Sequence, residues 1–225
     1  MNAIQDNLKA VGERIEAALA RAGRAPGTAR LLAVSKTFAP EVIQKAYDAG
    51  QRSFGENRVQ ELVAKAPALP SDCEWHLIGH LQRNKVRQAL GVATWIHSVD
   101  SPALLERIQR LAEEVGAAPK LLLEVNVSGE ESKIGFVPDT VEAALAEMPA
   151  GPAECVGLMT MAPLGADERT LRSIFGGLRQ LRDSLQDRLG MPLPELSMGM
   201  SSDLEAAIAE GATIVRVGTA IFGRR

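Results

Sequence analysis

The sequence predicts an α/β fold, a (β/α)8 TIM barrel in a single domain, with one extra helix before the barrel. Short apolar runs alternate with amphipathic helical patterns from residue 31 onward, which is typical of βα units around a parallel sheet. Eight such units share residues 31–225, about 24 residues each, close to the lower limit for a compact barrel. The first run lacks the glycine-rich turn of a doubly wound open sheet, because Ser35, Lys36 and Thr37 follow it.

Residues 1–30 are predicted to form an N-terminal helix and a linker. Apolar residues recur at spacings of three and four residues from Ile4 to Leu19, with charged residues on the other face. Gly23 and Pro26 end this pattern. The barrel then occupies 31–225, so the whole chain, 1–225, is expected to be one domain.

Eight β-type runs are predicted as the strands of the barrel: 31–35, 52–54, 75–78, 94–99, 120–127, 154–159, 195–198 and 213–217. Seven helical patterns are predicted between them: 40–49, 56–66, 83–90, 102–115, 138–148, 170–189 and 202–210. A short final helix is expected after residue 218. No residues are left for a second domain.

Composition limits the classes of function. Hydrophobic residues make up 46% of the 225 residues and the net charge is −3, so no basic field favours nucleic acid as a partner. No run approaches the ~18 apolar residues of a membrane span, and the N-terminus lacks the apolar core of a signal peptide. Two cysteines, Cys73 and Cys155, fit a reducing compartment. We therefore expect a cytoplasmic protein without nucleic-acid or membrane partners, and the composition fits a monomer slightly better than an oligomer.

Polar and glycine-rich segments follow each predicted strand. In a barrel of this type, ligand and catalytic groups lie at the carboxyl ends of the strands. Lys36 directly follows an apolar strand, where a charged residue either marks the exposed end or points into the mouth of the barrel. A lysine in the mouth has the amine needed to form a Schiff base with a carbonyl.

The last two strand ends are predicted to form an anion site. Gly199 permits close approach of the backbone, and Ser201 or Ser202 is placed to cap the following helix. Gly218 and Thr219 repeat this pattern after the eighth strand. Phosphate sites of barrels lie at these two loops, although two ordinary capped turns would show the same residues.

Arg216 alternates with Val215 and Val217, so its side chain faces the opposite side of the strand from both valines. Facing inward, it would lie beside the anion site and contact a ligand. Facing outward, it would be solvated.

Other polar residues carry weaker signals. The three histidines have no metal-ligand spacing, so no metal is assigned: His76, His80 and His97. The methionines near strand ends are of a type that usually fills a core: Met159, Met161, Met198 and Met200. Arg83, Lys85 and Arg87 are expected on a solvated face, with an anion contact as the alternative. Lys133 lies in the loop after the fifth strand, where it either leans over the mouth or is exposed.

Eight segments, in order along nearly the whole chain, carry a resemblance to a known family: 33–36, 54–61, 75–85, 126–128, 133–136, 157–161, 196–201 and 215–223. Their arrangement resembles the barrel domain of pyridoxal-phosphate proteins of the alanine-racemase type, and more closely the pyridoxal phosphate homeostasis protein family. His80 and Arg83 depart from the family pattern, which has proline and serine there.

The resemblance implies seven cofactor-binding positions and no catalytic residue: Lys36, Asn57, Met200, Ser201, Arg216, Gly218 and Thr219. Lys36 would hold pyridoxal 5′-phosphate as a Schiff base, and Asn57 and Met200 would line the pocket. Ser201, Gly218 and Thr219 would receive the phosphate. Arg216 would lie near the pyridine nitrogen.

The family's role, also implied by resemblance, is cofactor binding in vitamin B6 and amino-acid homeostasis, with apoenzymes that need the cofactor as partners. A cationic Arg216 would disfavour a proton on the ring nitrogen and make the ring a poorer electron sink. Racemases of this fold add a tyrosine from a further β-domain, whereas Tyr47, the one tyrosine, is predicted in the first barrel helix. A racemase and a Schiff-base sugar-phosphate enzyme such as a class I aldolase remain the alternatives.

Overall fold

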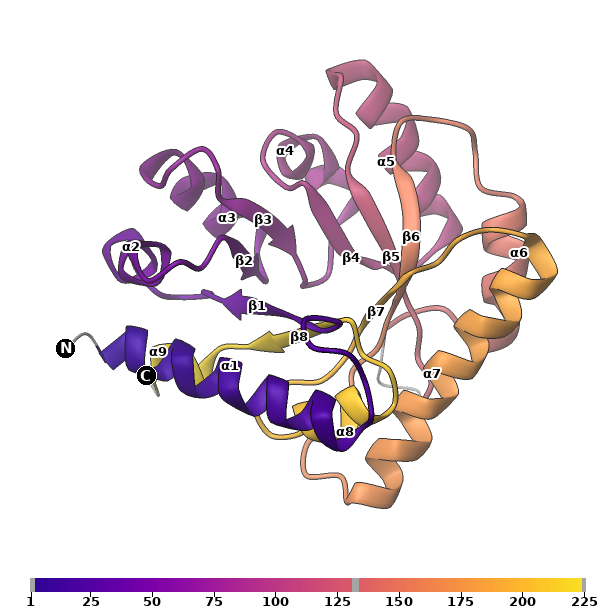
Figure 1. Cartoon of the computed structure of the whole chain (residues 1–225). Helices are drawn as coiled ribbons and strands as arrows, with labels where there is room; N and C mark the ends of the chain where they lie inside the picture. The colour runs from indigo at the N-terminus through magenta and orange to yellow at the C-terminus, as the bar shows by residue number, and fades with distance from the viewer. Residues whose placement is uncertain (1–2, 131–133, 224–225) are drawn as a thin grey trace.

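The computed structural model describes residues 3–130 and 134–223, in which eight parallel strands close into a barrel (Figure 1). Neighbours in sequence are neighbours around the barrel, and the first strand closes it against the eighth, with Ala33 opposite Val217. The strands are β1 Arg30–Val34, β2 Ser53–Glu56, β3 Glu74–Leu77, β4 Trp95–Val99, β5 Lys120–Glu124, β6 Glu154–Met159, β7 Glu195–Ser197 and β8 Ile214–Val217.

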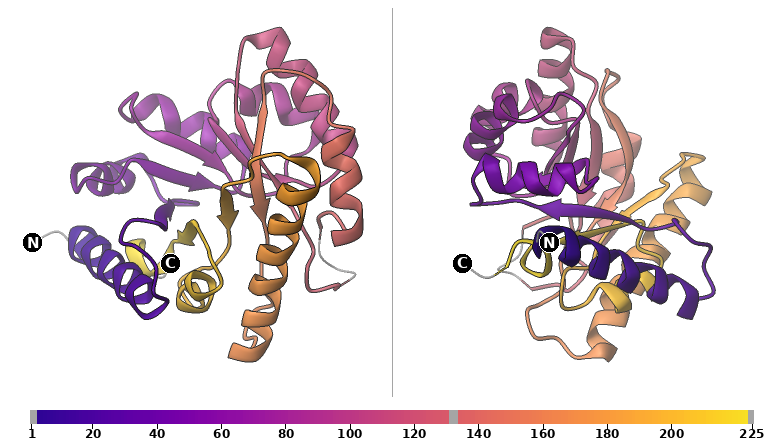
Figure 2. Two further views of the ribbon diagram at one scale, coloured as in Figure 1. Left: turned by 45° about the vertical axis from the view of Figure 1, so that its right-hand side comes forward. Right: turned by 60° about the vertical axis from the view of Figure 1, so that its left-hand side comes forward.

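Helices surround the barrel, as Figures 1 and 2 show from three directions. They are α1 Ala3–Arg21, α2 Pro40–Asp48, α3 Val59–Lys65, α4 Val86–Leu90, α5 Pro102–Val115, α6 Val141–Ala146, α7 Glu168–Leu189, α8 Leu204–Ala209 and α9 Thr219–Phe222. Single 3-10 turns follow α3 and precede α4 and α6: Ala66–Ala68, Arg83–Lys85 and Pro138–Thr140. No helix in the described part of the chain is long and apolar enough to cross a membrane.

The predicted fold class is confirmed, and all eight predicted strands are present. Several boundaries differ from the predicted ones, and two of these differences bear on the site. Glu56 was predicted to start a helix, but it ends β2, paired with Leu77 of β3, and its side chain is fully buried. The fifth strand was predicted to reach residue 127 and ends at Glu124, because Asn126 donates its N–H to the carbonyl of Phe136 across a turn.

The core has two parts on either side of the strands. The larger lies between the strands and the helices and contains fully buried large side chains such as Phe54 and Phe175. The smaller fills the inside of the barrel with Leu32, Trp95, Leu122, Val156, Met159 and Ile214. Each large apolar side chain buried in this way stabilises the fold by about 1.5–3 kcal/mol. Side chains therefore fill the barrel below its carboxyl end, as in other barrels of this type.

The helix α1 packs along α8 and α9, as Figure 1 shows. Asn7 donates from Nδ2 to the carbonyl of Ile221 at 2.8 Å, and Arg14 forms an ion pair with Glu205 at 2.9 Å. These contacts fix the extra N-terminal helix to the two elements that follow β7 and β8. The helix thus supports the loops at one side of the candidate site.

Candidate functional site

A cavity of about 810 Å³ opens at the carboxyl ends of the strands. All seven residues singled out from the sequence line it: Lys36, Asn57, Met200, Ser201, Arg216, Gly218 and Thr219. They come from four strand ends, those of β1, β2, β7 and β8, which the closed barrel brings to one place. The sequence therefore located the residues of this cavity although they are up to 183 positions apart along the chain (36 to 219).

Lys36 follows β1 after one residue and is half-buried at the cavity wall. Asn57 directly follows β2, the neighbouring strand, and lines the same wall. A Cβ atom at Gly79, after β3, would lie 2.3 Å from the carbonyl oxygen of Asn57, so only glycine fits there. This close approach of β2 and β3 holds the backbone that carries Asn57.

Arg216 faces away from the two valines, as predicted; of the two directions left open it takes the inward one, and only 5% of it is exposed. Its Nη1 donates to the carbonyl oxygen and to Oγ of Ser197, each at 2.7 Å, and Nη2 donates to the Thr160 carbonyl at 3.0 Å. Burial lowers the pKa of Arg216 to about 10, although the charges of Glu124 and Asp203 oppose this shift. The guanidinium is therefore still a cation at neutral pH, fixed by neutral acceptors at the cavity.

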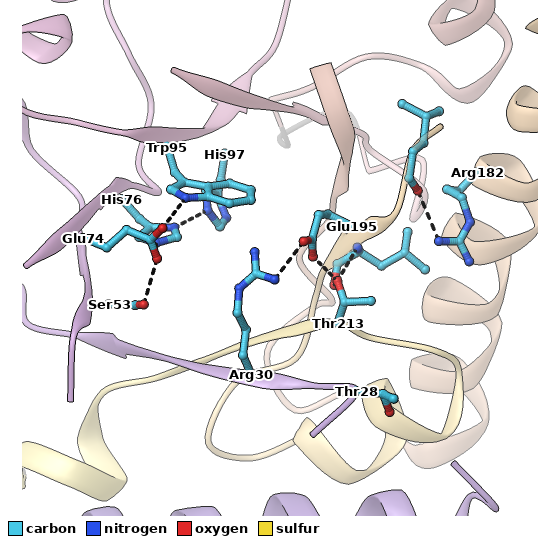
Figure 3. A network of polar contacts seen from close by, with 12 residues as sticks. Thr28, Arg30, Ser53, Glu74, His76, Trp95, His97, Arg182, Glu195 and Thr213 are labelled. Atoms are coloured by element: carbon cyan, nitrogen blue, oxygen red, sulfur yellow. Dashed lines mark hydrogen bonds and ion pairs between the residues drawn. The ribbon is translucent and has the colours of Figure 1, made fainter. Parts of the chain in front are cut away.

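A chain of hydrogen bonds runs from Arg216 through the inside of the barrel. Glu74 is an ionised carboxylate and only accepts, so each neutral histidine ring donates from Nε2 and accepts at Nδ1. The Ser197 hydroxyl, which accepts from Arg216, therefore donates to His97 Nδ1, 2.9 Å away. His97 Nε2 then donates to His76 Nδ1 at 2.9 Å, and His76 Nε2 donates to Glu74 Oε2 at 3.0 Å (Figure 3). Burial lowers the pKa of both histidines, that of His97 strongly, so both rings are neutral as this arrangement requires.

The loops after β7 and β8 present free backbone donors to the cavity. The N–H groups of Ser201, Ser202, Gly218 and Thr219 donate to no acceptor within residues 3–130 and 134–223. All four residues line the cavity. Several unpaired N–H groups around one cavity form a binding place for an anion such as a phosphate.

The predicted cap of α8 was wrong. Asp203, not Ser201 or Ser202, is the N-cap residue, and its Oδ1 accepts the N–H of Met200. The two serines lie in the turn ahead of the cap, which leaves their own N–H groups free. Gly199 has φ +92°, and a Cβ atom there would lie 2.5 Å from Cβ of Ala207. The predicted close approach of the backbone at Gly199 is confirmed.

Glu124 is a cavity residue that the sequence did not single out. It ends β5, lines the cavity and is only 7% exposed, and its carboxyl accepts no hydrogen bond within the described ranges. Burial, followed by the charge of Asp100, raises its pKa to about 7, against the effect of Arg216. In the barrel order β5 is opposite β1, so Glu124 lies across the barrel from Lys36. The predicted strand ran to residue 127 and thereby hid this strand end.

The remaining candidates have other positions. Arg83 and Arg87 are exposed, and Arg87 forms an ion pair with Glu114, so the predicted solvated face is confirmed for these two, whereas Lys85 is half-buried. His80, noted as a departure from the family pattern, lines the cavity and bonds Asp100 at 2.9 Å. Lys133 lies outside the described residues. No three metal-binding side chains are grouped in the part of the chain that the structure describes.

The methionines divide between core and cavity. Met198 is fully buried, and Met159 belongs to the cluster inside the barrel, as expected of a core residue. Met161 and Met200 instead line the cavity. The expectation that methionines near strand ends fill a core therefore holds for Met159 and Met198 and is wrong for Met161 and Met200.

Solved structures with this fold include close and distant relatives. The structure of PipY from Synechococcus elongatus PCC7942 with PLP bound is 43% identical in sequence and has a TM-score of 0.80. The match covers 93% of this chain and 100% of the PipY chain. The structure of the same protein without PLP is 44% identical in sequence and has a TM-score of 0.84. An alanine racemase of Clostridium difficile 630 gives a TM-score of 0.76 at 13% identity, with 56% of its chain covered, which shows a shared fold alone.

Sequence comparisons place the chain more closely. A family model described as "Alanine racemase, N-terminal domain" matches residues 4–225. A pyridoxal phosphate homeostasis protein from Aquifex aeolicus is 46% identical over 100% of this chain and 99% of its own length. The human protein of that name is 40% identical over 97% of this chain and 85% of its own length. The chain therefore belongs to the alanine racemase N-terminal domain family and, within it, to the pyridoxal phosphate homeostasis proteins.

Proposed function

We propose that this protein binds pyridoxal 5′-phosphate in the cavity and acts in intracellular vitamin B6 and amino-acid homeostasis as a binding protein rather than an enzyme. One observation carries the proposal. A lysine amine, a buried guanidinium and four unpaired backbone N–H groups line the same cavity. The bound PLP of the similar PipY structure and the name of the curated relatives support it.

The residues present fit this cofactor. The free N–H groups of Ser201, Gly218 and Thr219 would receive the phosphate. Lys36 would hold the aldehyde carbon, and Asn57 and Met200 would line the ring side of the pocket. The cofactor's aldehyde condenses with a primary amine to a Schiff base, with loss of one water molecule.

Arg216 determines what the bound ring can do. We place its guanidinium near the pyridine nitrogen, where a fixed cation disfavours a second positive charge. Its three hydrogen bonds to Ser197 and Thr160 keep the cation in place. A ring that stays unprotonated is a poorer electron sink, which suits holding the cofactor better than turning over substrates.

Borohydride trapping tests the attachment. The protein is loaded with pyridoxal 5′-phosphate, reduced, digested and analysed by mass spectrometry. We expect one phosphopyridoxyl group on the peptide that contains Lys36, and an unchanged pattern for the Lys45→Ala variant, since Lys45 is exposed on α2. Labelling spread over several surface lysines, with none preferred, would reject the proposed site.

A racemase is the second candidate, and one observation favours it. Glu124 is a buried carboxyl with a pKa of about 7 across the barrel from Lys36, which is where a second acid or base would be needed. Tyr47 does not serve this purpose, because its hydroxyl bonds Asp72 and it is not a cavity residue. Deuterium uptake at the α-carbon of alanine or serine separates the two functions: we expect none above the rate with free cofactor, whereas fast exchange would establish the enzyme.

We further propose a cytoplasmic monomer that delivers the cofactor to apoenzymes that depend on it. The free, buried thiols of Cys73 and Cys155 support a reducing compartment. Light scattering during gel filtration tests the monomer. Mixing the loaded protein with an apo-aminotransferase tests delivery: activity should return faster than the cofactor dissociates into buffer, and equal rates would argue against direct transfer.

A further inference from the structure

The residue that follows Lys36 has a strained backbone. Thr37 has φ +67° and is the one non-glycine residue with a positive φ in the described part of the chain. A β-branched residue adopts this left-handed region only when its surroundings hold it there. The strain therefore needs a source of support beside Lys36.

Glu61, on α3, supplies this support. Its Oε2 accepts the backbone N–H of Thr37 at 2.7 Å and the ammonium of Lys65 at 2.8 Å. Burial on its own would raise the pKa of Glu61, but the hydrogen bonds from Lys65 and Thr37 outweigh burial and lower it. The carboxylate is thus ionised at neutral pH and holds the strained residue by a charge-assisted hydrogen bond.

The residue before Lys36 is held by the same group of side chains. Lys65 Nζ donates to the Ser35 carbonyl at 3.1 Å, and Ser35 Oγ donates to Glu56 Oε1 at 2.7 Å. Lys65 also donates to Glu56 Oε1 at 2.9 Å. Lys65 is 7% exposed and Glu56 is fully buried, so water competes little for these bonds.

We propose that Glu56, Glu61 and Lys65 form a clamp that positions Lys36 for attachment of the ligand, an inference that rests on the proposed function. The clamp makes hydrogen bonds to both chain neighbours of Lys36, and none of its three side chains lines the cavity. It also uses all three N–H donors of Lys65. This second amine, close in space to Lys36, is thereby kept from reacting with an aldehyde.

The clamp is tested first in the ligand-free protein. Hydrogen exchange of the Thr37 amide, measured by NMR, reports its bond to Glu61. We expect Glu61→Ala to accelerate this exchange roughly tenfold or more, the factor given by loss of a hydrogen bond to a charged group. Glu61→Gln keeps an acceptor oxygen and should recover most of the protection. Glu41→Ala, which removes an exposed carboxylate on α2, is the matched control and should leave the exchange unchanged.

The positioning role is tested on the same variants with pyridoxal 5′-phosphate as the probe. The rate of adduct formation at Lys36 is followed by borohydride quenching and peptide mass, with thermal unfolding as a check that each variant folds. We expect about a tenfold slower rate for Glu61→Ala, partial recovery for Glu61→Gln and a wild-type rate for Glu41→Ala.

Each contrary outcome has a distinct meaning. Unchanged exchange at Thr37 in Glu61→Ala would overturn the clamp. Faster exchange with an unchanged adduct rate would overturn its positioning role and leave it structural. If the wild-type protein formed no adduct on Lys36, the proposed function and with it the positioning role would fail, while exchange in the ligand-free protein would still report the hydrogen bond.

Discussion

Arg216 donates to the hydroxyl oxygen of Ser197 at 2.7 Å, and this contact joins the cation to the chain of hydrogen bonds inside the barrel. At the other end the Glu74 carboxylate accepts from His76 Nε2, which sets the tautomer of His76, through it that of His97, and so the direction of the Ser197 hydroxyl. The orientation of a cation at the cavity is therefore coupled to a carboxylate near the opposite end of the barrel, Glu74.

Replacing Ser197 tests this coupling. Ser197→Ala removes the acceptor of Arg216 Nη1 and the donor to His97, while the carbonyl contact at 2.7 Å remains. We expect a loss of about 1–3 kcal/mol in the free energy of unfolding and several-fold weaker cofactor binding. Nitrogen-15 NMR should show the Nδ1 resonance of His97 shift, because this nitrogen loses its hydrogen-bond donor. Ser173→Ala, on the exposed face of α7, is the control. An unaltered histidine spectrum would argue against the directional chain.

The buried histidines should make the protein sensitive to mild acid. Burial lowers the folded-state pKa of His76 and of His97, so the unfolded chain, with pKa values near 6.5, binds more protons. Their contribution is present above about pH 6.5 and is lost as the pH falls, by up to about 1.4 kcal/mol per pH unit for each histidine. Urea unfolding between pH 7.5 and 5.5 measures the slope. His97→Gln should flatten it, and an equal slope in both proteins would contradict this assignment.

Glu124 should have the opposite pH dependence. Its folded-state pKa, about 7, lies above the usual 4.5, so its contribution to stability is complete below pH 4.5 and is lost as the pH rises toward 7. We expect Glu124→Gln to exceed the wild type by about 2–3 kcal/mol in free energy of unfolding at pH 8 and to match it near pH 4.5. Urea titrations at both pH values check this. Glu154→Gln, at an exposed position of β6, should show no such difference.

Two glycines should respond oppositely to alanine. At Gly199 a Cβ atom would lie 2.5 Å from Ala207, and φ is +92°, so Gly199→Ala should cost about 2–4 kcal/mol in free energy of unfolding and weaken phosphate binding. Gly12 lies inside α1 with open space around it, so Gly12→Ala should stabilise by about 0.5–1 kcal/mol. Thermal unfolding and a phosphate titration measure both effects. A tolerated Gly199→Ala would mean that the loop after β7 can move without loss.

Features that depend on periodicity could be predicted from the sequence. The alternation of Arg216 with Val215 and Val217 placed its side chain on the opposite face of the strand from both valines, because successive side chains of a strand face opposite sides. The strand ends predicted the cavity residues for a different reason. In a barrel every carboxyl end faces one mouth, so polar residues far apart in sequence must meet there.

Features that depend on the stagger between strands and on local turns could not be predicted from the sequence. His76 and His97 meet across neighbouring strands, and no spacing along the chain marks such a pair. Glu124 was hidden by a turn that ends β5 three residues before the apolar pattern does. The left-handed Thr37 has no signal in its residue type, because the clamp rather than its own preference holds it.

The absorption spectrum of the loaded protein tests the central claim most directly. Wild-type protein dialysed after incubation with pyridoxal 5′-phosphate should be yellow, with a visible band that shifts to that of the free aldehyde on denaturation. Lys36→Ala should lose this band, and Lys45→Ala should keep it. A Lys36→Ala protein that still shows the visible band of a bound Schiff base would contradict the assignment of Lys36, and a colourless wild-type protein would contradict the proposed function itself.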